Sequence, residues 1–215
     1  DELPETAAPS PGAFVQAYQS LLDDGATTIV SINLSEALSA TAQAARTAAT
    51  TIEGADIHIV DSASATVGQG TLVLRAAEAA RDGASAEDII TSTNELSART
   101  HVLGVLDTLD NLKKGGRVGN AQAMIGSLLS IKPCIDLSTG SVEEAGRQRT
   151  RKKALAWLAG ELPANATNVA IGHGLAPDID KFIAMIDVEI DRISLIGPVV
   201  GTHGGPRVIG LSYTV

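Results

Sequence analysis

Hydroxyl-bearing side chains gather in one short segment of the sequence, where they could bind an anion. Ser35, Ser39 and Thr41 follow a β-branched, apolar stretch that is typical of a buried strand. In open α/β sheets, ligands bind where such strands end and the next helices begin. The free N–H groups of a helix that starts near Ser39 would receive a carboxylate or a phosphate. Plain capping of that helix by Ser35 or Ser39 explains the same residues, and the residues alone favour it.

A glycine-rich turn with a histidine is the second candidate site. Gly201–Pro206 contains His203 and three glycines, and it follows a stretch, Ile193–Thr202, that we predict to be a strand. Glycines in such a turn let a ligand or another backbone approach closely. For His203, the binding and the structural interpretations stay equally open. Thr6, just before the first predicted helix, offers a further hydroxyl. A simpler explanation is that this segment only leads into the N-terminal cap of the helix.

The remaining histidines and the known enzyme motifs give weaker signals. His58 and His101 lie within predicted strands, where packing is the more common role, and His173 at the end of another strand stays open. The sequence contains no phosphate-binding loop, dinucleotide fingerprint, nucleophile elbow or zinc-protease motif. We therefore expect neither a metal nor a cofactor, and no residue stands out as catalytic.

Basic residues form two groups in an otherwise acidic chain. These groups contain Lys113, Lys114, Arg117, Arg147, Arg149, Arg151, Lys152 and Lys153. Such runs usually form a solvated helix face, and this interpretation is slightly favoured. Two groups in one half of the chain could also hold an anionic partner or a phosphate.

The elements that must position these side chains alternate between helix and strand. In the first half, spacing and β-branched runs predict helices over 11–24, 39–51 and 70–82 and strands over 27–34 and 57–60. In the second half they predict a helix over 87–98 and strands over 101–105, 131–137, 169–173 and 193–202. This alternation predicts a parallel sheet flanked by helices, followed by further α/β structure.

Charge divides the chain into two halves. The 215 residues carry a net charge of −9, which argues against a general nucleic-acid binder because phosphate binding needs a basic face. Residues 1–96 hold 14 acidic and 3 basic residues, a net −11, whereas residues 97–215 hold 11 acidic and 13 basic ones, a net +2. We therefore expect two α/β domains, 1–96 and 97–215.

The composition also indicates a compartment. Residues are 44% hydrophobic but only 2% aromatic, and no apolar run reaches the roughly 18 residues of a membrane span. The first residues lack the features of a signal peptide. Cys134, the single cysteine, cannot form an internal disulfide, which favours a reducing compartment. We expect a cytoplasmic protein.

One long motif resembles a known family. Asp107–Val118, continuing to Leu128–Pro133, is similar to the signature of the DegV family of bacterial fatty-acid-binding proteins. Four further segments match that family, so the resemblance covers essentially the whole chain: Ser35–Thr41, Val60–Ser62, Arg149–Ala154 and Gly201–Pro206.

The resemblance implies a two-domain DegV-like α/β fold, with a parallel, helix-flanked sheet in the first domain and a smaller α/β sheet in the second. It implies a long-chain fatty acid buried between the domains, its carboxylate bound at Thr6, Ser39, Ala40 and His203. Such a protein does no covalent chemistry. It presents the carboxylate to a separate fatty acid kinase, which forms an acyl-phosphate for phospholipid synthesis, and it contacts the membrane transiently to exchange lipid.

The resemblance also gives roles to the basic groups. Arg149 matches a family position near the opening and would contact the head group or the added phosphate. We assign the kinase interface to Lys113, Lys114, Arg117, Arg147 and Arg151.

The chain departs from the family pattern in a few places. Ala7, Ala40 and Arg207 stand where the family has Ser, Gly and Gly. Relatives also carry several dozen residues before the segment that contains Thr6, including a first strand, so we expect the first sheet to lack that strand.

Other classes of function also fit the residues. The two-part α/β arrangement resembles parts of dihydroxyacetone kinases and sugar phosphotransferases, in which case His203 would bind a polar substrate or carry a phosphoryl group. An interaction module without a ligand is the third interpretation. A dry, apolar cavity would favour the lipid carrier, and a polar one the enzyme.

Overall fold

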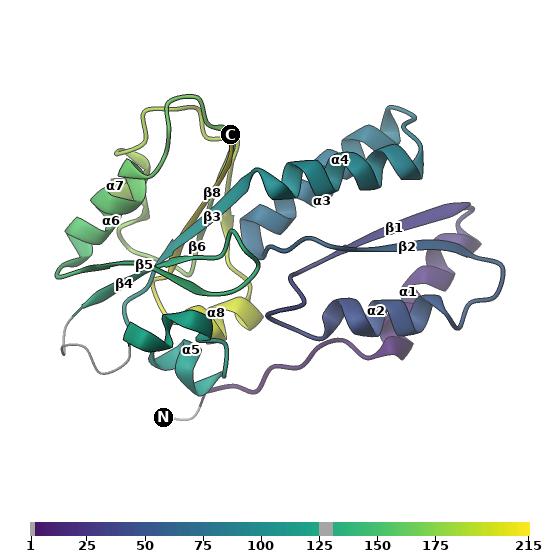
Figure 1. The fold of residues 1–215 in the computed structure, drawn as a ribbon, viewed down its shortest axis with the longest axis horizontal. Coiled ribbons are helices and arrows are strands. Elements are labelled where there is room, and N and C mark those ends of the chain that lie inside the picture. Colours follow the sequence, from purple (N-terminus) through teal and green to yellow (C-terminus); the bar gives the residue numbers. More distant parts are fainter. Residues whose placement is uncertain (1–2, 125–130) are drawn as a thin grey trace.

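Two sheets organise the computed structural model of the protein, which describes residues 3–124 and 131–215 (Figure 1). The motif residues 128–130 lie outside the described residues. The first half contains α1 (Pro11–Asp23), β1 (Thr28–Asn33), α2 (Thr41–Ala49), β2 (Asp56–Asp61), α3 (Thr66–Arg81) and α4 (Ala86–Ala98). The second half contains β3 (Thr100–Val105), α5 (Asp110–Lys114), the 3-10 helix η1 (Gly119–Met124), β4 (Lys132–Asp136), β5 (Glu143–Gln148), α6 (Arg151–Gly160), β6 (Thr167–His173), α7 (Ile179–Ile183), β7 (Arg192–Leu195), α8 (Pro198–Gly204) and β8 (Ile209–Thr214).

The first sheet is the parallel pair β1 and β2, flanked by helices as predicted. The two strands run in register from Thr28 opposite Asp56 to Asn33 opposite Asp61. α1 starts where the sequence indicates, because the Ser10 hydroxyl accepts a hydrogen bond from the Ala13 amide at 3.2 Å. Tyr18 of α1 then packs against this sheet. Figure 1 shows α1 and α2 on one side of the pair, with α3 and α4 on the other.

The second sheet is mixed and has six strands in the order β5-β4-β3-β8-β6-β7. Among the described strands of this sheet, β6 and β7 pair in parallel and the other neighbours are antiparallel. The two-domain α/β class is therefore confirmed. The expectation that the second sheet is the smaller one is wrong, because it has six strands against two in the first.

The two faces of the larger sheet have different environments. One face forms the main core, in which strand residues such as Leu103, Ile171 and Leu211 pack with Leu158 of α6 and Phe182 of α7. Because successive residues of a strand point to opposite faces, the residues between them face the other side. That other side is approached by α3, which also contacts β1 of the first sheet. The face that α3 approaches is the one that borders the candidate site.

One predicted strand is partly wrong. The stretch 193–202 divides into β7, which ends at Leu195, and helix α8, which begins at Pro198. Gly197 and Pro198 explain the break, since proline is favoured in the first turn of a helix and cannot donate to a sheet. His203 therefore lies in the last turn of a helix, and not in a turn after a strand. The following strand β8 was not predicted.

Two expectations about the whole chain remain, the absence of a membrane-spanning segment and the division into domains. Nowhere in the described parts of the chain is a helix both long and apolar enough to cross a membrane. The domain division at 96/97 stays a prediction.

Candidate functional site

A cavity of about 340 Å³ lies between the two halves of the fold. Residues of the N-terminal segment and of the segment that follows β1 line one side, and residues of β3, β4, α8 and β8 line the other. Most of the lining is aliphatic, and it includes Leu34, Val102, Leu112, Ile135, Ile196 and Val208. Such a surface favours an apolar ligand, because each methylene group removed from water contributes about 0.8 kcal/mol.

Polar side chains reach the same cavity from five separate segments. These side chains are Thr6, Ser39, Thr41, Thr66, Arg117 and His203. The Thr6 hydroxyl lies 2.8 Å from Nε2 of His203, although 197 positions separate the two residues in the chain. The hydroxyls of Ser39 and Thr41 lie 2.8 Å apart at the start of α2. The structure thus brings all three predicted hydrogen-bonding residues, Thr6, Ser39 and His203, to one cavity.

Thr6 reaches His203 because of the path of the N-terminal segment. Residues 3–10 contain no helix or strand, and α1 begins only after Ser10. Figure 1 shows this segment, in purple, running from α5 and α8 to α1 on the other side of the molecule. Thr6 lies part-way along it and so meets the end of α8.

Helix α5 holds His203 in place. The side-chain amide of Asn111 donates a hydrogen bond of 2.8 Å to the carbonyl of Thr202. A β-carbon at Gly115 would overlap the His203 ring, so only glycine allows the end of α5 to lie this close to the imidazole. Asn111 and Gly115 both belong to Asp107–Val118, the motif that carries the family resemblance. These contacts explain why that motif and His203 occur in the same protein: the motif positions the histidine.

Arg117 connects the two sides of the cavity. Its Nε donates to the carbonyl of Leu38 at 3.2 Å, beside Ser39, and its Nη1 donates to the carbonyl of Gly115 at 2.7 Å, beside His203. Burial of the ring, and then the positive charge of Arg117, lower the pKa of His203 below its ordinary value of 6.5. His203 is therefore neutral at pH 7. Arg117 borders the cavity, although the sequence had placed it at a partner interface.

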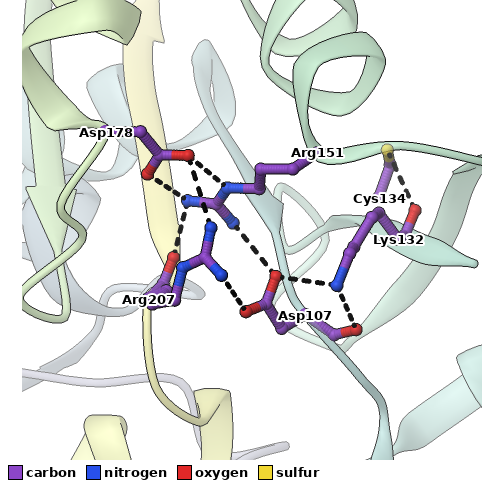
Figure 2. A network of polar contacts seen from close by, with 6 residues as sticks. All are labelled: Asp107, Lys132, Cys134, Arg151, Asp178 and Arg207. Carbon is purple, nitrogen blue, oxygen red and sulfur yellow. Dashed lines mark hydrogen bonds and ion pairs between the residues drawn. The ribbon is translucent and has the colours of Figure 1, made fainter.

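A network of ion pairs includes Arg207, which lies in the turn between α8 and β8 (Figure 2). We call Asp107, Lys132, Arg151, Asp178 and Arg207 the ion cluster. Arg151 binds Asp178 through two hydrogen bonds of 3.0 and 3.1 Å, while Lys132 lies 3.0 Å from Asp107. Arg207 lies 3.3 Å from Asp107 and 3.6 Å from Asp178. The hydrogen bonds from Arg151 are the main reason that the pKa of Asp178 is lowered.

The ion cluster explains one departure from the family pattern. Arg207 has φ +62°, a left-handed conformation that favours glycine. Its guanidinium compensates for the strained backbone by pairing with both carboxylates of the cluster. By contrast, Ala40 has an ordinary φ of −72°, so a β-carbon fits there without strain.

The other predicted site residues do not line the cavity. Ala40 is exposed and does not line the cavity, and Arg149 is exposed between β5 and α6. Lys113 and Lys114 are exposed on α5, and Arg147 is exposed on β5, where it binds Glu144. Arg151 differs from these residues because its side chain is only 12% exposed and its contacts are the carboxylates of the ion cluster.

The other histidines lie away from the cavity. His58 pairs with Asp56 at 2.9 Å, and the His101 ring stacks on Tyr213 with 5.0 Å between ring centroids. His173 ends β6. Among residues 3–124 and 131–215, no three His, Cys, Asp or Glu side chains are placed to hold a metal ion.

Comparison with known proteins identifies the family. A family profile described as "Uncharacterised protein, DegV family" matches residues 1–215. The chain belongs to the DegV family. A DegV domain-containing protein of Halalkalibacterium halodurans is 36% identical over 228 residues, which cover 100% of this chain and 80% of that protein.

Solved DegV structures share the fold. A structure described as "Fatty Acid Binding of a DegV family Protein" from Thermus thermophilus is 31% identical, with a TM-score of 0.85 over 99% of this chain and 79% of that one. A protein from Eubacterium ventriosum described as binding stearic acid is 26% identical, with a TM-score of 0.86 over 99% of this chain and 78% of that one.

Sequence reasoning did not single out several residues of the cavity. Thr66 has φ +53° at the start of α3, and nothing in its local sequence indicates that its side chain lines a cavity. Arg117 was found as part of a basic group, but its contacts with the carbonyls of Leu38 and Gly115 depend on the tertiary fold. The strand glycines Gly104 and Gly210, which line the cavity, gave no signal, because a glycine within an apolar strand has several explanations.

Proposed function

We propose that this DegV protein binds a long-chain fatty acid, with the acyl chain in the aliphatic cavity and the carboxylate at Thr6, Ser39 and His203. The observation that carries the proposal is the hydrogen bond between Thr6 and His203, which links two distant segments at the wall of an apolar cavity. The DegV relatives described as fatty-acid-binding proteins support the same ligand class.

The polar side chains can satisfy a carboxylate. With its hydrogen on Nε2, His203 donates to the Thr6 oxygen, and the Thr6 hydroxyl then donates to a carboxylate oxygen. The hydroxyls of Ser39 and Thr41 offer further donors. Several donors are needed, because a buried carboxylate without hydrogen bonds loses the stabilisation that water gave it. Arg117 lies between these groups and adds a positive charge.

The same geometry favours a carrier over an enzyme. The cavity combines a mostly aliphatic lining with a few neutral donors and one arginine, whereas a site for a polar substrate needs polar groups along its length. The protein would therefore shield the acyl chain, present the carboxylate to a separate fatty acid kinase and return to the membrane for lipid exchange. Acyl-phosphate would form on the kinase.

We propose the exposed basic residues as the kinase contact. Lys113 and Lys114 on α5 and Arg147 on β5 are exposed. The exposed Arg149, near the start of α6, would contact the head group or the added phosphate. Reversing the charge of Lys113 and Lys114 should reduce acyl-phosphate formation by the kinase while fatty-acid binding stays the same. Unchanged acyl-phosphate formation would remove these lysines from the contact.

Native mass spectrometry tests the proposed ligand. The protein as purified from a bacterial host should carry one long-chain fatty acid, which extraction with organic solvent would release and identify. An empty protein that also takes up no added stearic acid would overturn the proposal. Phosphate incorporated on His203 would instead favour the phosphotransfer function.

A further inference from the structure

Three glycines form a row across the centre of the six-stranded sheet. Gly104 of β3 lies opposite Gly210 of β8, and Gly210 also lies opposite Gly172 of β6. All three are buried. Glycine within a strand lowers stability, because it loses more backbone entropy on folding and packs no side chain. Three of them in register therefore need an explanation from packing or from a ligand.

Packing explains two of the three glycines. A β-carbon at Gly172 would lie 3.2 Å from Cγ1 of Ile196 and 3.2 Å from Cγ1 of Val67. A β-carbon at Gly104 would lie 3.2 Å from Cγ1 of Ile135. These distances are shorter than ordinary contacts, so neighbouring side chains already fill the space above both glycines.

Packing does not explain Gly210. The nearest atoms to a β-carbon there would be the carbonyl oxygens of Leu103 at 3.6 Å and Gly172 at 4.0 Å. Both are ordinary contacts with the backbone of the sheet itself. Gly210 is also not in a left-handed conformation. Among the described residues, no side chain comes within 4 Å of that β-carbon, and Gly210 and Gly104 both line the cavity.

We propose that Gly210 sets the width of the cavity where the acyl chain crosses the sheet, and thereby selects the length of the fatty acid that fits. This inference rests on the proposed function. Without a side chain at Gly210, methylene groups can lie directly against the strand backbone, between the aliphatic side chains of Val102 and Ile196 that also line the cavity. Each methylene group kept out of the cavity would weaken binding about fourfold.

The test compares the affinities of delipidated variants for stearic acid and for the shorter lauric acid, measured by isothermal titration calorimetry. Gly210→Val should weaken stearic acid binding about tenfold or more and lauric acid binding less, so that the ratio of the two affinities changes. Gly210→Ala should change the ratio in the same direction but less. Its β-carbon fits at ordinary distances, so this variant keeps the test valid if the valine variant does not fold.

Gly146 of β5 provides a matched control. A β-carbon there would lie 3.7 Å from Cβ of Cys134, which is as uncrowded as at Gly210, but Gly146 does not line the cavity. Gly146→Ala should leave both affinities unchanged. Melting temperatures of Gly210→Ala and Gly146→Ala should stay the same or rise, because alanine in a strand loses less backbone entropy than glycine.

The outcomes separate the two proposals. If wild-type protein binds stearic acid and both Gly210 variants keep the wild-type ratio of affinities, the role of Gly210 is wrong and the fatty-acid function stands. If Gly146→Ala changes the ratio as much as Gly210→Ala, the role of Gly210 is also wrong. If the wild-type protein binds neither acid, the proposed function fails and the role of Gly210 fails with it.

Discussion

Two polar clusters of the molecule, the ion cluster and the polar groups of the cavity, differ in how their charges are matched. In the first, the five residues of the ion cluster pair with one another at 3.0 to 3.8 Å. In the second, Thr6, Ser39 and His203 are neutral donors and acceptors at the wall of an apolar cavity. The first arrangement stabilises the fold, because its charges already have partners. The second can bind a ligand, because its hydrogen-bonding capacity is not used up within the protein.

The largest effect is expected from removing a charge of the ion cluster. Arg151→Ala leaves Asp178, whose side chain is 16% exposed, without its main partner, and it should lower the free energy of unfolding by about 3 kcal/mol. Urea unfolding measures this change. Arg147→Ala is the control, since Arg147 binds Glu144 at the surface and should cost less than about 1 kcal/mol. Equal losses in the two variants would show that the cluster does not stabilise the fold.

The complementary change removes a hydroxyl at the cavity. Thr6→Val keeps the shape of the side chain but loses the hydrogen bond to His203 and a donor to the carboxylate. Fatty-acid affinity should fall about tenfold, while the free energy of unfolding changes by less than about 1 kcal/mol. Titration calorimetry with stearic acid measures the affinity, with the exposed Thr27→Val as control. Wild-type affinity in Thr6→Val would place the carboxylate elsewhere.

A smaller effect is expected at Arg207, where two contributions oppose each other. Arg207→Gly removes the ion pairs of a side chain that is 42% exposed, but it also relieves the left-handed backbone. The free energy of unfolding should therefore change by less than about 1 kcal/mol. Chemical denaturation of Arg207→Gly beside Arg151→Ala tests this difference. A loss as large as that of Arg151→Ala would mean that Arg207 is a main support of the cluster.

The smallest effect is a pH dependence from His203. Its pKa in the folded, ligand-free protein is lower than its ordinary value of 6.5, so below pH 6.5 the unfolded chain binds a proton more readily than the folded one. His203 therefore lowers stability as the pH falls from 6.5 towards the folded-state pKa. In His203→Gln, unfolding curves between pH 7 and pH 5 should show a weaker loss of stability. An equal loss in both proteins would contradict the lowered pKa.

Much of the fold could be predicted from local patterns, and the failures have physical causes. α1 was predicted correctly because Ser10 and Pro11 mark its start. The expectation of a smaller second sheet came from the family resemblance and not from the local patterns. The edge strand β5 was not predicted because it carries charged residues such as Glu144 and Arg147 and has no apolar run. The segment of α8 was predicted as a strand because Val199 and Val200 extend a β-branched, apolar stretch.

The site was less predictable than the fold. Thr6, Ser39 and His203 were predicted from the family resemblance, and the cavity now contains all three. The basic residues Arg117 and Arg151 could not be told apart from Lys113 and Lys114 in the sequence. What distinguishes them is a partner distant in sequence, such as Asp178 for Arg151 or the Leu38 carbonyl for Arg117. Such pairings are not visible in the local pattern.

A crystal structure of the protein loaded with stearic acid tests the central claim most directly. We predict that the carboxylate lies within hydrogen-bonding distance of the Thr6 hydroxyl, next to His203 and Ser39, and that the acyl chain passes over Gly210. A carboxylate at the other end of the cavity, or a cavity that stays empty in the presence of excess stearic acid, would contradict the account.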